Sequence, residues 1–583
     1  MSEKSIHLSI NGLPVEVAEG TMILQAAKQI GIDIPHLCYH PDQRAKARCR
    51  ICSVEVKGSR KLRPACATAC REGMEVRTDT KLVHDTQRGI LQLILADHNQ
   101  DCLHCPKDGN CELQALCTRF NIQGSPLPRV SQPSARTNDN PALIRDASKC
   151  VKCGRCIRAC KDTQGIEALH FAQRSAEICA TTAYSLPLMQ TDCVLCGQCS
   201  LVCPTAAITE RDDTERVLAA LHDPEKHVIV QVAPSVRVAL GDAFHLPPGE
   251  VVTGKMVRAL RLLGFDKVFD TNFGADLTIM EEASELLSRL QGHGVLPMMT
   301  SCSPGWVYYL EKHHENLIPH LSTAKSPMSM FGAVAKTYYA ELAKIDPQKI
   351  VTVSIMPCTA KKFEAQRQEL SHDGLYDVDI VLTTRELAKL IRYLGARFED
   401  LPADAFDSPL GEATGAGAIF GTTGGVMEAA LRTAASFAGT EAEKARIEYQ
   451  EVRGMKDIRE ATVYVGGKPV RVAIAHTLKA AKHIAEAMEK GQAPYEFIEV
   501  MACPGGCLGG GGQPLTTTNA WRRERQKALY AIDRALPLRK SHENPEIQRL
   551  YKEYLGEPLK GLAHKLLHTH FTKYPKAYTF RRA

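Results

Sequence analysis

Hydrophobic and polar residues alternate in two short runs at the start of the chain. Residues 5–10 (SIHLSI) and 13–17 (LPVEV) flank Asn11-Gly12, a pair suited to a type I′ turn, and this pattern predicts a β-hairpin. From Thr21 to Ile30 apolar residues recur at helical spacing, with Thr21 as the expected cap and Gly31 as the expected stop. A hairpin followed by a helix indicates a small β-grasp module.

The pattern changes further along the chain. A helical stretch (GILQLILADH) leads into a compact cysteine-rich loop, and a segment rich in Pro, Ser and Asn follows, which is typical of a linker. Two similar eleven-residue cysteine groups come next, and then strand-like and helix-like patterns alternate, as in an α/β domain. We therefore predict a multidomain α+β and α/β protein, with domains at 1–78, 79–120, 147–209 and 210–583 and a linker at 121–146.

Four apolar, β-branched runs in the last region stop at Pro, Ser or Cys. They are predicted to be buried strands of the large α/β domain. Because ligands of such sheets bind beyond the carboxyl ends of the strands, we expect the residues that follow these runs to converge on one crevice between two lobes. The runs are HVIVQVAPS (227–235), VLPMMTSCS (295–303), IVTVSIMPC (350–358) and EFIEVMAC (496–503).

Charge and hydropathy narrow the function classes. The 72 Lys and Arg residues are mixed with 66 Asp and Glu along the 583-residue chain, which gives no reason to expect a nucleic acid partner. The N-terminus lacks a basic region followed by an apolar run, and no stretch of about 18 apolar residues occurs. We expect a cytoplasmic protein without a membrane span.

Cysteine sets this composition apart, because most of the 22 cysteines lie in Cys-x-x-Cys groups. Thiolates two residues apart reach one metal centre from a single loop, whereas a disulfide framework has no need of that spacing. Iron–sulfur clusters are therefore the first interpretation. The group C-x10-C-x2-C-x13-C after the β-grasp signals suits a two-iron two-sulfur cluster, with structural zinc as the alternative, and consists of Cys38, Cys49, Cys52 and Cys66.

A second group supplies three thiolates, Cys102, Cys105 and Cys111, without a fourth cysteine at a natural offset. Either Cys117 or His98 completes a four-iron cluster here, because imidazole can replace thiolate at iron. Spacing alone leaves both open.

Two later runs match the bacterial pattern C-x2-C-x2-C-x3-C, in which the fourth cysteine of each run ligates the other cluster. We therefore expect two further four-iron clusters. One is held by Cys150, Cys153, Cys156 and Cys203, and the other by Cys160, Cys193, Cys196 and Cys199.

The last four cysteines lie in TSCSPGW (Cys302), MPCTAKKFE (Cys358) and EVMACPGGC (Cys503 and Cys507). These segments resemble the three signature loops of FeFe-hydrogenases, and the upstream groups resemble the clostridial-type multi-cluster form over nearly the whole chain. The resemblance implies the reaction 2 H⁺ + 2 e⁻ ⇌ H₂ at an H-cluster. In that family a four-iron cluster shares one cysteine with a two-iron unit that carries carbon monoxide, cyanide and a dithiolate amine.

The resemblance also implies roles around this centre. Cys507 would bridge the two parts of the H-cluster, Cys358 and Cys503 would ligate its four-iron part, and Lys361 would donate to a cyanide. Met328 stands where many relatives have Gln. The residues implied to line the pocket are Pro234, Ser235, Met328, Met356 and Met501.

The first signature loop departs from the commonest family pattern, TSCCPGW, because Ser303 stands in place of the second cysteine. By alignment Cys302 would be the proton relay and Ser303 would fall at a cluster-ligand position. An alkoxide is a poor substitute for thiolate on iron, so we predict that Cys302 ligates and Ser303 takes the relay place. The alignment-based assignment stays open.

The segment TIMEEASELLSRL predicts a helix with an apolar stripe and an adjoining polar stripe at Glu282, Glu285 and Arg289. On the pattern alone, that polar stripe is a solvated helix face. The resemblance in NFGADLTIMEEASEL instead implies a proton path, with Arg289 and Glu285 outermost, followed by Ser322, Glu282 and the first-loop residue.

The resemblance implies one two-iron cluster, three accessory four-iron clusters and the H-cluster as cofactors. It implies ferredoxin or NAD(P)-linked flavin and iron–sulfur subunits as electron partners, and maturation proteins besides. The alternatives are a hydrogenase-like assembly protein without the two-iron unit, which Lys361 and the methionines disfavour, and an electron-wiring subunit resembling complex I, which leaves the last four cysteines unexplained. Cys70 and Cys179 are read as small buried fillers, and the glycine runs at 415–432 and 507–514 as close backbone approaches.

Overall fold

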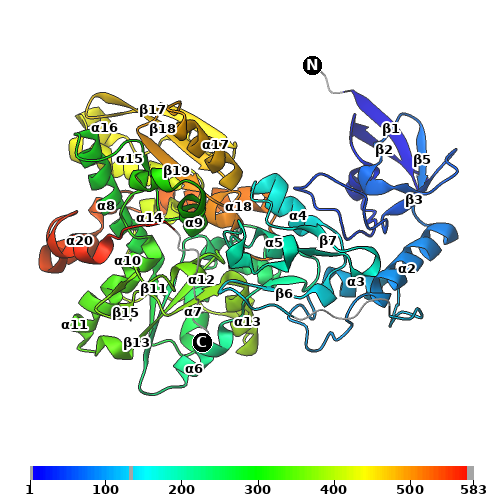
Figure 1. Ribbon diagram of the computed structural model, residues 1–583, viewed down its shortest axis with the longest axis horizontal. Coiled ribbons are helices and arrows are strands. Elements are labelled where there is room, and N and C mark those ends of the chain that lie inside the picture. Colours follow the sequence, from blue (N-terminus) through cyan, green and yellow to red (C-terminus); the bar gives the residue numbers. More distant parts are fainter. Residues whose placement is uncertain (1–3, 130–135, 574–583) are drawn as a thin grey trace.

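A computed structural model of the chain describes residues 4–129 and 136–573. Its N-terminal strands form a five-stranded sheet in the order β2-β1-β5-β3-β4 (Figure 1). The hairpin is confirmed, since Asn11 and Gly12 both have positive φ, 52° and 83°, as a type I′ turn requires. The bounds are β1 (Ser5–Ile10), β2 (Leu13–Ala18), β3 (Ser53–Val56), β4 (Arg63–Pro64) and β5 (Met74–Arg77).

The first helix, α1 (Ile23–Gln29), begins later than the sequence predicted. Met22, not Thr21, is the residue before the helix, so the predicted cap is wrong. The Gln25 side chain accepts the Met22 N–H at 3.2 Å and satisfies the helix start without a hydroxyl cap. The predicted stop at Gly31 fits, because this residue follows the helix with a φ of 77°.

The next two helices, α2 (Lys81–Ala96) and α3 (Glu112–Arg119), pack against the two-iron loop. Leu91 of α2 and Leu113 of α3 share one buried cluster with Leu37 and Ile51 of that loop. Of the predicted linker, residues 130–135 lie outside the described residues, and its last part forms β6 (Leu143–Arg145), which pairs with β9 (Ile208–Glu210). A three-residue strand is too short for a recognisable alternation.

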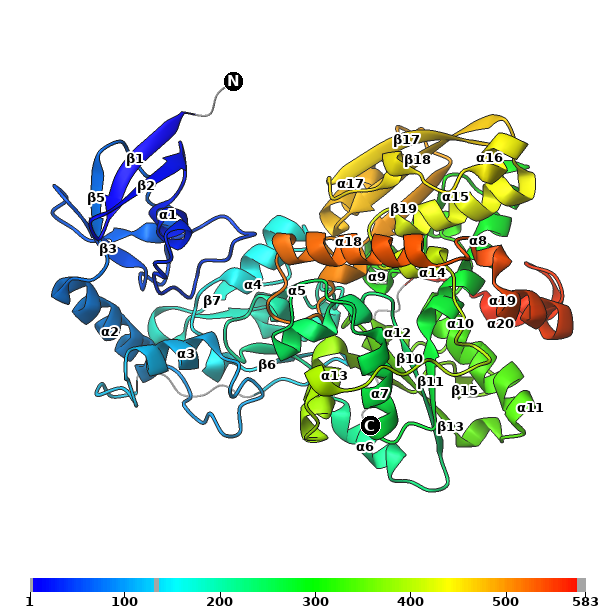
Figure 2. The ribbon, with the colours of Figure 1, turned by 180° about the vertical axis from the view of Figure 1, so that it is seen from behind.

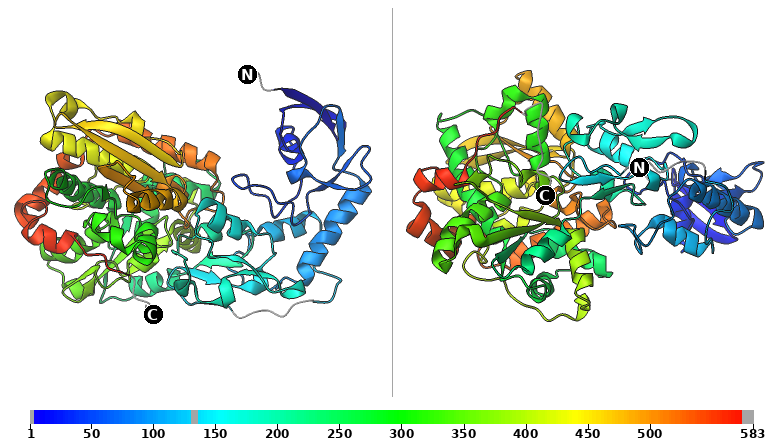
Figure 3. Two further views of the ribbon diagram at one scale, coloured as in Figure 1. Left: turned by 45° about the horizontal axis from the view of Figure 1, so that its top comes forward. Right: turned by 60° about the horizontal axis from the view of Figure 1, so that its bottom comes forward.

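The internal repeat folds as two equivalent turns. Gly154 precedes α4 (Arg155–Arg158) and Gly197 precedes α5 (Gln198–Leu201), with φ values of 74° and 70°. Between the two turns lies the hairpin of β7 (His170–Ala172) and β8 (Cys179–Thr181). Figure 3 shows this domain between the N-terminal sheet and the large C-terminal domain.

The C-terminal domain has two four-stranded sheets, besides the short antiparallel pair of β14 (Ser371–His372) and β15 (Leu375–Tyr376). The first is parallel, in the order β11-β10-β13-β16, and the second has the order β12-β19-β18-β17 with an antiparallel β17–β18 hairpin. The four predicted strands divide between them. Only the run at 295–303 is much shorter than predicted, because Pro297 offers no N–H to a ladder. The bounds are β10 (His227–Val232), β11 (Lys267–Asp270), β12 (Met298–Met299), β13 (Ile350–Met356), β16 (Ile380–Thr383), β17 (Ile458–Val465), β18 (Lys468–His476) and β19 (Phe497–Met501).

Helices surround both sheets (Figure 2). The predicted helix around 278–290 is part of α8 (Thr271–Leu290), whose start is capped by Asp270 accepting the Asn272 N–H at 2.9 Å. No helix in the described ranges is long and apolar enough to cross a membrane. The other helices of this domain include α6 (Thr214–Leu221), α7 (Thr253–Leu262), α9 (Pro304–His313), α10 (Pro327–Val334), α11 (Ala340–Ala343), α12 (Lys361–Glu364), α13 (Thr384–Tyr393), α14 (Gly415–Ile419), α15 (Gly425–Ala438), α16 (Glu441–Ala445) and α17 (Leu478–Glu489).

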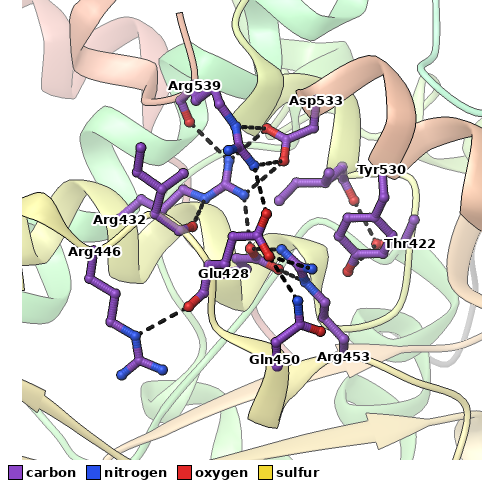
Figure 4. Close-up of polar contacts among 12 residues, drawn as sticks. Thr422, Glu428, Arg432, Arg446, Gln450, Arg453, Tyr530, Asp533 and Arg539 are labelled. Carbon is purple, nitrogen blue, oxygen red and sulfur yellow. Dashed lines mark hydrogen bonds and ion pairs between the residues drawn. The ribbon is translucent and has the colours of Figure 1, made fainter. Parts of the chain in front are cut away.

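The C-terminal segment wraps back over this domain as α18 (Asn519–Ala535), α19 (Pro545–Leu550) and α20 (Gly561–Leu567). A fully buried ion-pair network ties α18 to α15 (Figure 4). Arg432 donates to Asp533 Oδ1 at 2.8 Å and to Glu428 Oε1 at 2.8 Å. Because each charge is paired, the network fixes α18 against the second lobe.

Candidate active site and cluster-binding residues

A cavity of about 90 Å³ lies where strands from both lobes end. It has room for more than one water-sized atom group. The loops after β10, β12, β13 and β19 all contribute to its lining, so the predicted convergence is confirmed. Its lining includes Pro234, Cys302, Ser303, Met328, Met356, Cys358, Lys361, Met501, Cys503 and Cys507.

Ser235 stands behind this lining. Its hydroxyl donates to the carbonyl oxygen of Cys507 at 3.3 Å, and the Gln513 side-chain amide donates to the Ser235 hydroxyl at 3.3 Å. The hydroxyl therefore supports the Cys507 loop from the β10 side.

The glycine run after Cys507 makes the close approach that the sequence predicted. A Cβ at Gly511 would lie 2.3 Å from the Cys196 carbonyl oxygen, and one at Gly510 would lie 2.2 Å from the Pro357 carbonyl oxygen. Only glycine permits this packing. The loop that carries Cys507 is thereby pressed against both the Cys358 loop and the four-iron domain.

Lys361 is buried at the cavity wall at the start of α12. Its Nζ donates to the Ser326 hydroxyl at 2.7 Å and lies 2.7 Å from Glu364 Oε2. The carboxylate balances the charge of the ammonium group. The cavity wall therefore carries a fixed cationic donor.

The cavity thiols lie in a dry, apolar place. Burial raises the pKa of Cys358 to about 12 and that of Cys507 to about 11, and it raises the pKa of Cys302 and of Cys503 well above the usual range. A metal centre would hold such thiols as thiolates. Soft donors in apolar surroundings fit an iron–sulfur cluster.

The two disputed first-loop residues face different neighbours. Cys302 packs against the hydrophobic cluster that includes the apolar residues of α8. After burial, the carboxyl of Glu282 is the largest charge effect that raises its pKa, and Cys507 contributes a smaller one. The Ser303 hydroxyl oxygen instead accepts the Ala502 N–H at 3.4 Å, next to Cys503. Cys302 thus lies toward the acidic helix and Ser303 toward the cluster-ligand loop.

The outer residues of the implied proton path are joined by hydrogen bonds. Arg289 Nη2 donates to Glu285 Oε1 at 2.6 Å, and the Ser322 hydroxyl donates to Glu285 Oε2 at 2.7 Å. Glu285 and Arg289 are 8% and 6% exposed, whereas Ser322 and Glu282 are fully buried. The structure thus orders these groups from the surface inward.

Glu282 occupies an exceptional environment for a carboxyl group. Burial, followed by the neighbouring carboxyls of Glu285 and Glu499, raises its pKa to about 8. The Ser301 backbone N–H opposes this rise in pKa as the smallest of the effects, and no described side chain is hydrogen-bonded to the carboxyl group. The raised pKa favours the protonated form of the Glu282 carboxyl near neutral pH.

The two-iron group is drawn together in the N-terminal domain. The Cys38 thiol lies in hydrogen-bond contact with those of Cys49 and Cys66, and the Cys52 thiol with that of Cys66. The Cys49 N–H donates to the Cys38 sulfur at 3.4 Å. Backbone N–H donation to sulfur is typical of iron–sulfur loops. Cys70 packs in the hydrophobic core of this domain.

The two ferredoxin-like sets combine across the repeat as predicted. One cavity of about 200 Å³ has walls that include Cys150, Cys153 and Cys156 of the first run together with Cys203 of the second. Conversely, Cys160 lies close to Cys193. Its charge is the second largest cause, after burial, of the raised pKa of the Cys193 thiol, so the fourth cysteine of the first run lies near the cysteines of the second run. The Cys179 thiol in β8 also lines the first cavity, a position that the sequence did not indicate.

Both candidates for the fourth ligand of the group of Cys102, Cys105 and Cys111, namely His98 and Cys117, lie in surroundings that suit a ligand. Burial lowers the pKa of His98 to about 4, and His98 Nδ1 has no hydrogen-bond partner among the described residues. The ring is therefore neutral, as a metal-bound imidazole must be. Cys117, in turn, lies close enough for Cys111 and Cys102 to contribute to raising its pKa, after burial. Spacing and contacts do not separate His98 from Cys117.

Several neighbours of the clusters gave no sequence signal. Arg158 Nη2 donates to the Cys38 carbonyl oxygen at 2.7 Å, across a domain boundary. Gln164 Nε2 donates to the Ala502 carbonyl oxygen at 2.9 Å, beside Cys503. Arginine and glutamine carry no motif, so only the fold identifies these contacts.

Comparison with known protein families covers most of the chain. The iron only hydrogenase large subunit, C-terminal domain, matches residues 226–511, and the iron hydrogenase small subunit matches residues 519–574. Upstream, a two-iron two-sulfur binding domain matches residues 3–81, the iron–sulfur binding region of NADH-ubiquinone oxidoreductase-G matches 87–126, and a four-iron dicluster domain matches 145–209.

The thiol groups, the two-lobed domain and these matches define an iron–sulfur oxidoreductase with electron-carrying domains ahead of a hydrogenase domain. The chain is 47% identical over 578 residues to the NADP-reducing hydrogenase subunit HndD of Solidesulfovibrio fructosivorans, covering 97% of this chain and 98% of that protein. It is 42% identical over 574 residues to iron hydrogenase 1 of Clostridium pasteurianum, covering 97% and 99%. The chain belongs to the FeFe-hydrogenase family and is a hydrogenase.

A solved structure agrees with this assignment. A variant of the FeFe-hydrogenase HydA1 from Chlamydomonas reinhardtii superposes with a TM-score of 0.57 at 45% identity, covering 62% of this chain and 99% of that chain. Together with the family matches to the iron–sulfur domains, it confirms the expected fold class of iron–sulfur domains joined to a large hydrogenase domain.

Proposed function

We propose that the cavity between the lobes holds the H-cluster, with Cys358, Cys503 and Cys507 as ligands. The observation that carries this proposal is the convergence of these thiols, one buried and two half-buried, on one cavity with the Lys361 ammonium. When bound, the cluster supplies the metal centre at which H₂ is formed or split. The two-iron cluster and three accessory four-iron clusters belong to the other thiol groups. For the group of Cys102, Cys105 and Cys111 we choose His98 as the fourth ligand, because its lowered pKa favours the neutral ring that a metal binds and its Nδ1 has no hydrogen-bond partner among the described residues.

The cavity residues orient the cluster and exclude water. Lys361, held by Ser326 and Glu364, presents its ammonium group as a donor to a cyanide ligand. Met328, Met356 and Met501 line the cavity with soft apolar groups, which contribute no acidic proton.

The proposed path for protons runs along the acidic residues of α8. Glu285, held by Arg289 and Ser322, is the outer group, and Glu282 is the inner carboxyl that carries a proton at neutral pH. A buried acid with a pKa near the working pH transfers protons in both directions. The inner step then passes to a first-loop side chain.

The contacts of the first loop favour the alignment-based roles over our sequence prediction. Cys302 faces Glu282, which suits a relay, and Ser303 lies beside Cys503, which suits the fourth ligand position. We therefore propose Cys302 as the relay and Ser303 as an oxygen donor near the four-iron part. The reverse assignment remains the alternative that mutation decides.

Backbone contacts support an electron route between the domains. Arg158 joins the loop of Cys38 to the run that contains Cys153. Gln164, just after the end of that run, contacts the Cys196 thiol of the second run and donates to the loop of Cys503. Electrons therefore reach the cavity from the N-terminal domains, which lie farthest from it (Figure 3).

For the electron partner, we propose NAD(P)-linked flavin and iron–sulfur subunits, with ferredoxin as the alternative. The similarity to a subunit of an NADP-reducing hydrogenase supports this choice. The Cys102 side of the third group is exposed and offers a point of electron entry. Maturation proteins would insert the two-iron unit.

A hydrogen-evolution assay tests the proposed site. Protein matured with its two-iron unit should evolve H₂ from reduced viologen, and Cys507→Ser should lose this activity. The signals of the accessory clusters in electron paramagnetic resonance (EPR) should persist in the variant and serve as the control for folding. Undiminished H₂ evolution by Cys507→Ser would refute the assigned site.

A further inference from the structure

Arg522 lies on α18 between the two-iron domain and the catalytic domain. It is 4% exposed, and its Nη1 lies 3.1 Å from Asp42 Oδ2 of the two-iron loop. Asp42 also accepts the Asn519 N–H at 2.9 Å, at the start of the same helix. Figure 2 shows this end of α18 beside the loop of the N-terminal domain. Asp42 of the two-iron domain thus forms an ion pair with Arg522 of the C-terminal segment.

The other side of the Arg522 side chain packs against glycines on either side of Cys507, Gly505 and Gly509. A Cβ at Gly509 would lie 2.5 Å from Arg522 Nε, and one at Gly505 would lie 3.2 Å from Arg522 Cδ. Glycine at both positions lets the side chain approach the backbone of the cluster-binding loop. The guanidinium group is therefore in the immediate surroundings of the proposed four-iron part.

Arg522 Nε is buried and has no hydrogen-bond partner among the described residues. A buried N–H of a charged group normally has an acceptor. The carbonyls and carboxylates described nearby leave this one unpaired, whereas the sulfur atoms of a bound four-iron cluster are acceptors of suitable chemistry. The unpaired N–H is a second, independent indication that Arg522 belongs to the surroundings of the cluster.

Neighbouring charged groups act on Arg522 in opposite directions. Burial lowers its pKa, and Asp42 and the Cys503 thiol oppose that effect while Arg525 adds to it. Arg525 is itself paired with Asp242 and donates to the Leu508 carbonyl oxygen at 2.8 Å. Asp42 is therefore the carboxylate that balances Arg522.

We propose that Arg522 is a positioning residue that sets the reduction potential of the four-iron part of the active-site cluster, and that Asp42 determines how strongly its charge acts. This inference rests on the proposed function, since it takes Cys503 as a ligand. Reduction adds one electron, supplied by the accessory clusters, and hence one negative charge to the four-iron part. A nearby guanidinium stabilises that reduced form and raises the potential, whereas Asp42 weakens the effect.

The pairing also couples the two ends of the chain. The Asp42 carboxylate reaches Arg522 only while the two-iron domain is docked in the position described. A displacement of that domain would remove the carboxylate and leave the positive charge of Arg522 unbalanced beside the cluster loop. The reduction potential of the four-iron part therefore depends on whether the two-iron domain is docked.

Potentiometric EPR titration of protein produced without the two-iron unit tests this inference without relying on activity. Arg522→Met should shift the midpoint potential of the active-site four-iron signal downward, and Arg522→Lys should shift it less. Asp42→Asn should shift the same signal upward, because it removes the balancing charge. Lys527→Met, an exposed cation on the same helix, is the matched control and should leave the potential unchanged.

The opposite signs separate an electrostatic role from a structural one. A distorted loop would move both variants in the same direction, and that result, or unchanged potentials in both, would overturn the inference. If Arg522→Met fails to fold, Asp42→Asn alone decides, because its upward shift is required. Absence of the active-site four-iron signal in the unsubstituted protein would instead overturn the ligand assignment on which the inference rests.

Discussion

Glu282 shows how one side chain changes meaning between sequence and structure. Its pattern on α8 is that of a solvated helix face, yet the residue is fully buried and no described side chain is hydrogen-bonded to its carboxyl group. Isolated burial of this kind is costly for the charged form, so the group stays protonated. Such perturbed groups cluster at functional sites.

Glu282→Gln removes the titrating proton with little change in volume. Because general acid–base groups contribute about 10²–10⁴-fold to rate, H₂ evolution should fall by at least about 100-fold. The measurement is the viologen-linked rate, with the infrared bands of the matured cluster as the control for metal content. Near-normal turnover in Glu282→Gln would show that protons enter elsewhere.

The first-loop pair gives a second residue-scale prediction. If Cys302 is the relay, Cys302→Ala should retain the active-site four-iron signal and lose most of the turnover, whereas Ser303→Ala should weaken or remove that signal. Serine is a weaker acid than cysteine, whose ordinary pKa is about 8.5, and this favours the thiol as the relay. Iron content and EPR spectra distinguish the outcomes. Loss of the cluster in Cys302→Ala with an intact cluster in Ser303→Ala would restore the sequence prediction.

At the scale of elements, the join between α15 and α18 depends on charge. Arg432→Met should leave Asp533 and Glu428 buried without their shared cation and should destabilise the catalytic domain by about 3–5 kcal/mol. Within the described ranges, Asp533 then keeps Arg539 as its cationic partner, and Glu428 keeps Arg453. Thermal unfolding of Arg432→Met beside Lys527→Met measures this difference. Equal melting temperatures for the two variants would contradict the role given to the network.

The elements also show what the sequence could predict. The hairpin at Asn11-Gly12, the strands β10, β13 and β19 and the helix α8 carry strong local patterns, and each was found near its predicted place. Short strands such as β6 and β12 carry too few residues for a period, so they were missed or shortened. Local pattern was informative where an element is long and its environment uniform.

Some residues of the candidate site could be predicted from the sequence, and others could not. Cysteine groups have spacing that reflects a shared metal centre, so the thiols that line the cavities could be proposed from the sequence. Arg158, Gln164 and Arg522 act through contacts between domains, and such contacts leave no local pattern. Which of Cys302 and Ser303 faces Glu282 depends on how the loop after β12 enters α9, and that is also a property of the fold.

For the whole molecule, the arrangement is a chain of thiol groups that leads to one buried cavity. The N-terminal sheet lies at one end, the ferredoxin-like domain in the middle and the two-lobed domain at the other end (Figure 3). The proposed proton path lies on the α8 side, whereas the contacts of Arg158 and Gln164 lie on the side of the ferredoxin-like domain. Electrons and protons therefore meet at the cavity from different directions.

Infrared spectroscopy of matured protein is the most direct test of the central claim that this cavity holds an H-cluster. Metal-bound carbon monoxide and cyanide absorb where protein does not, so the account predicts sharp bands of both ligands in the full-length protein. Those bands should disappear in Cys507→Ala. A fully matured, iron-replete protein without such bands, or a Cys507→Ala variant that keeps them unchanged, would contradict the account.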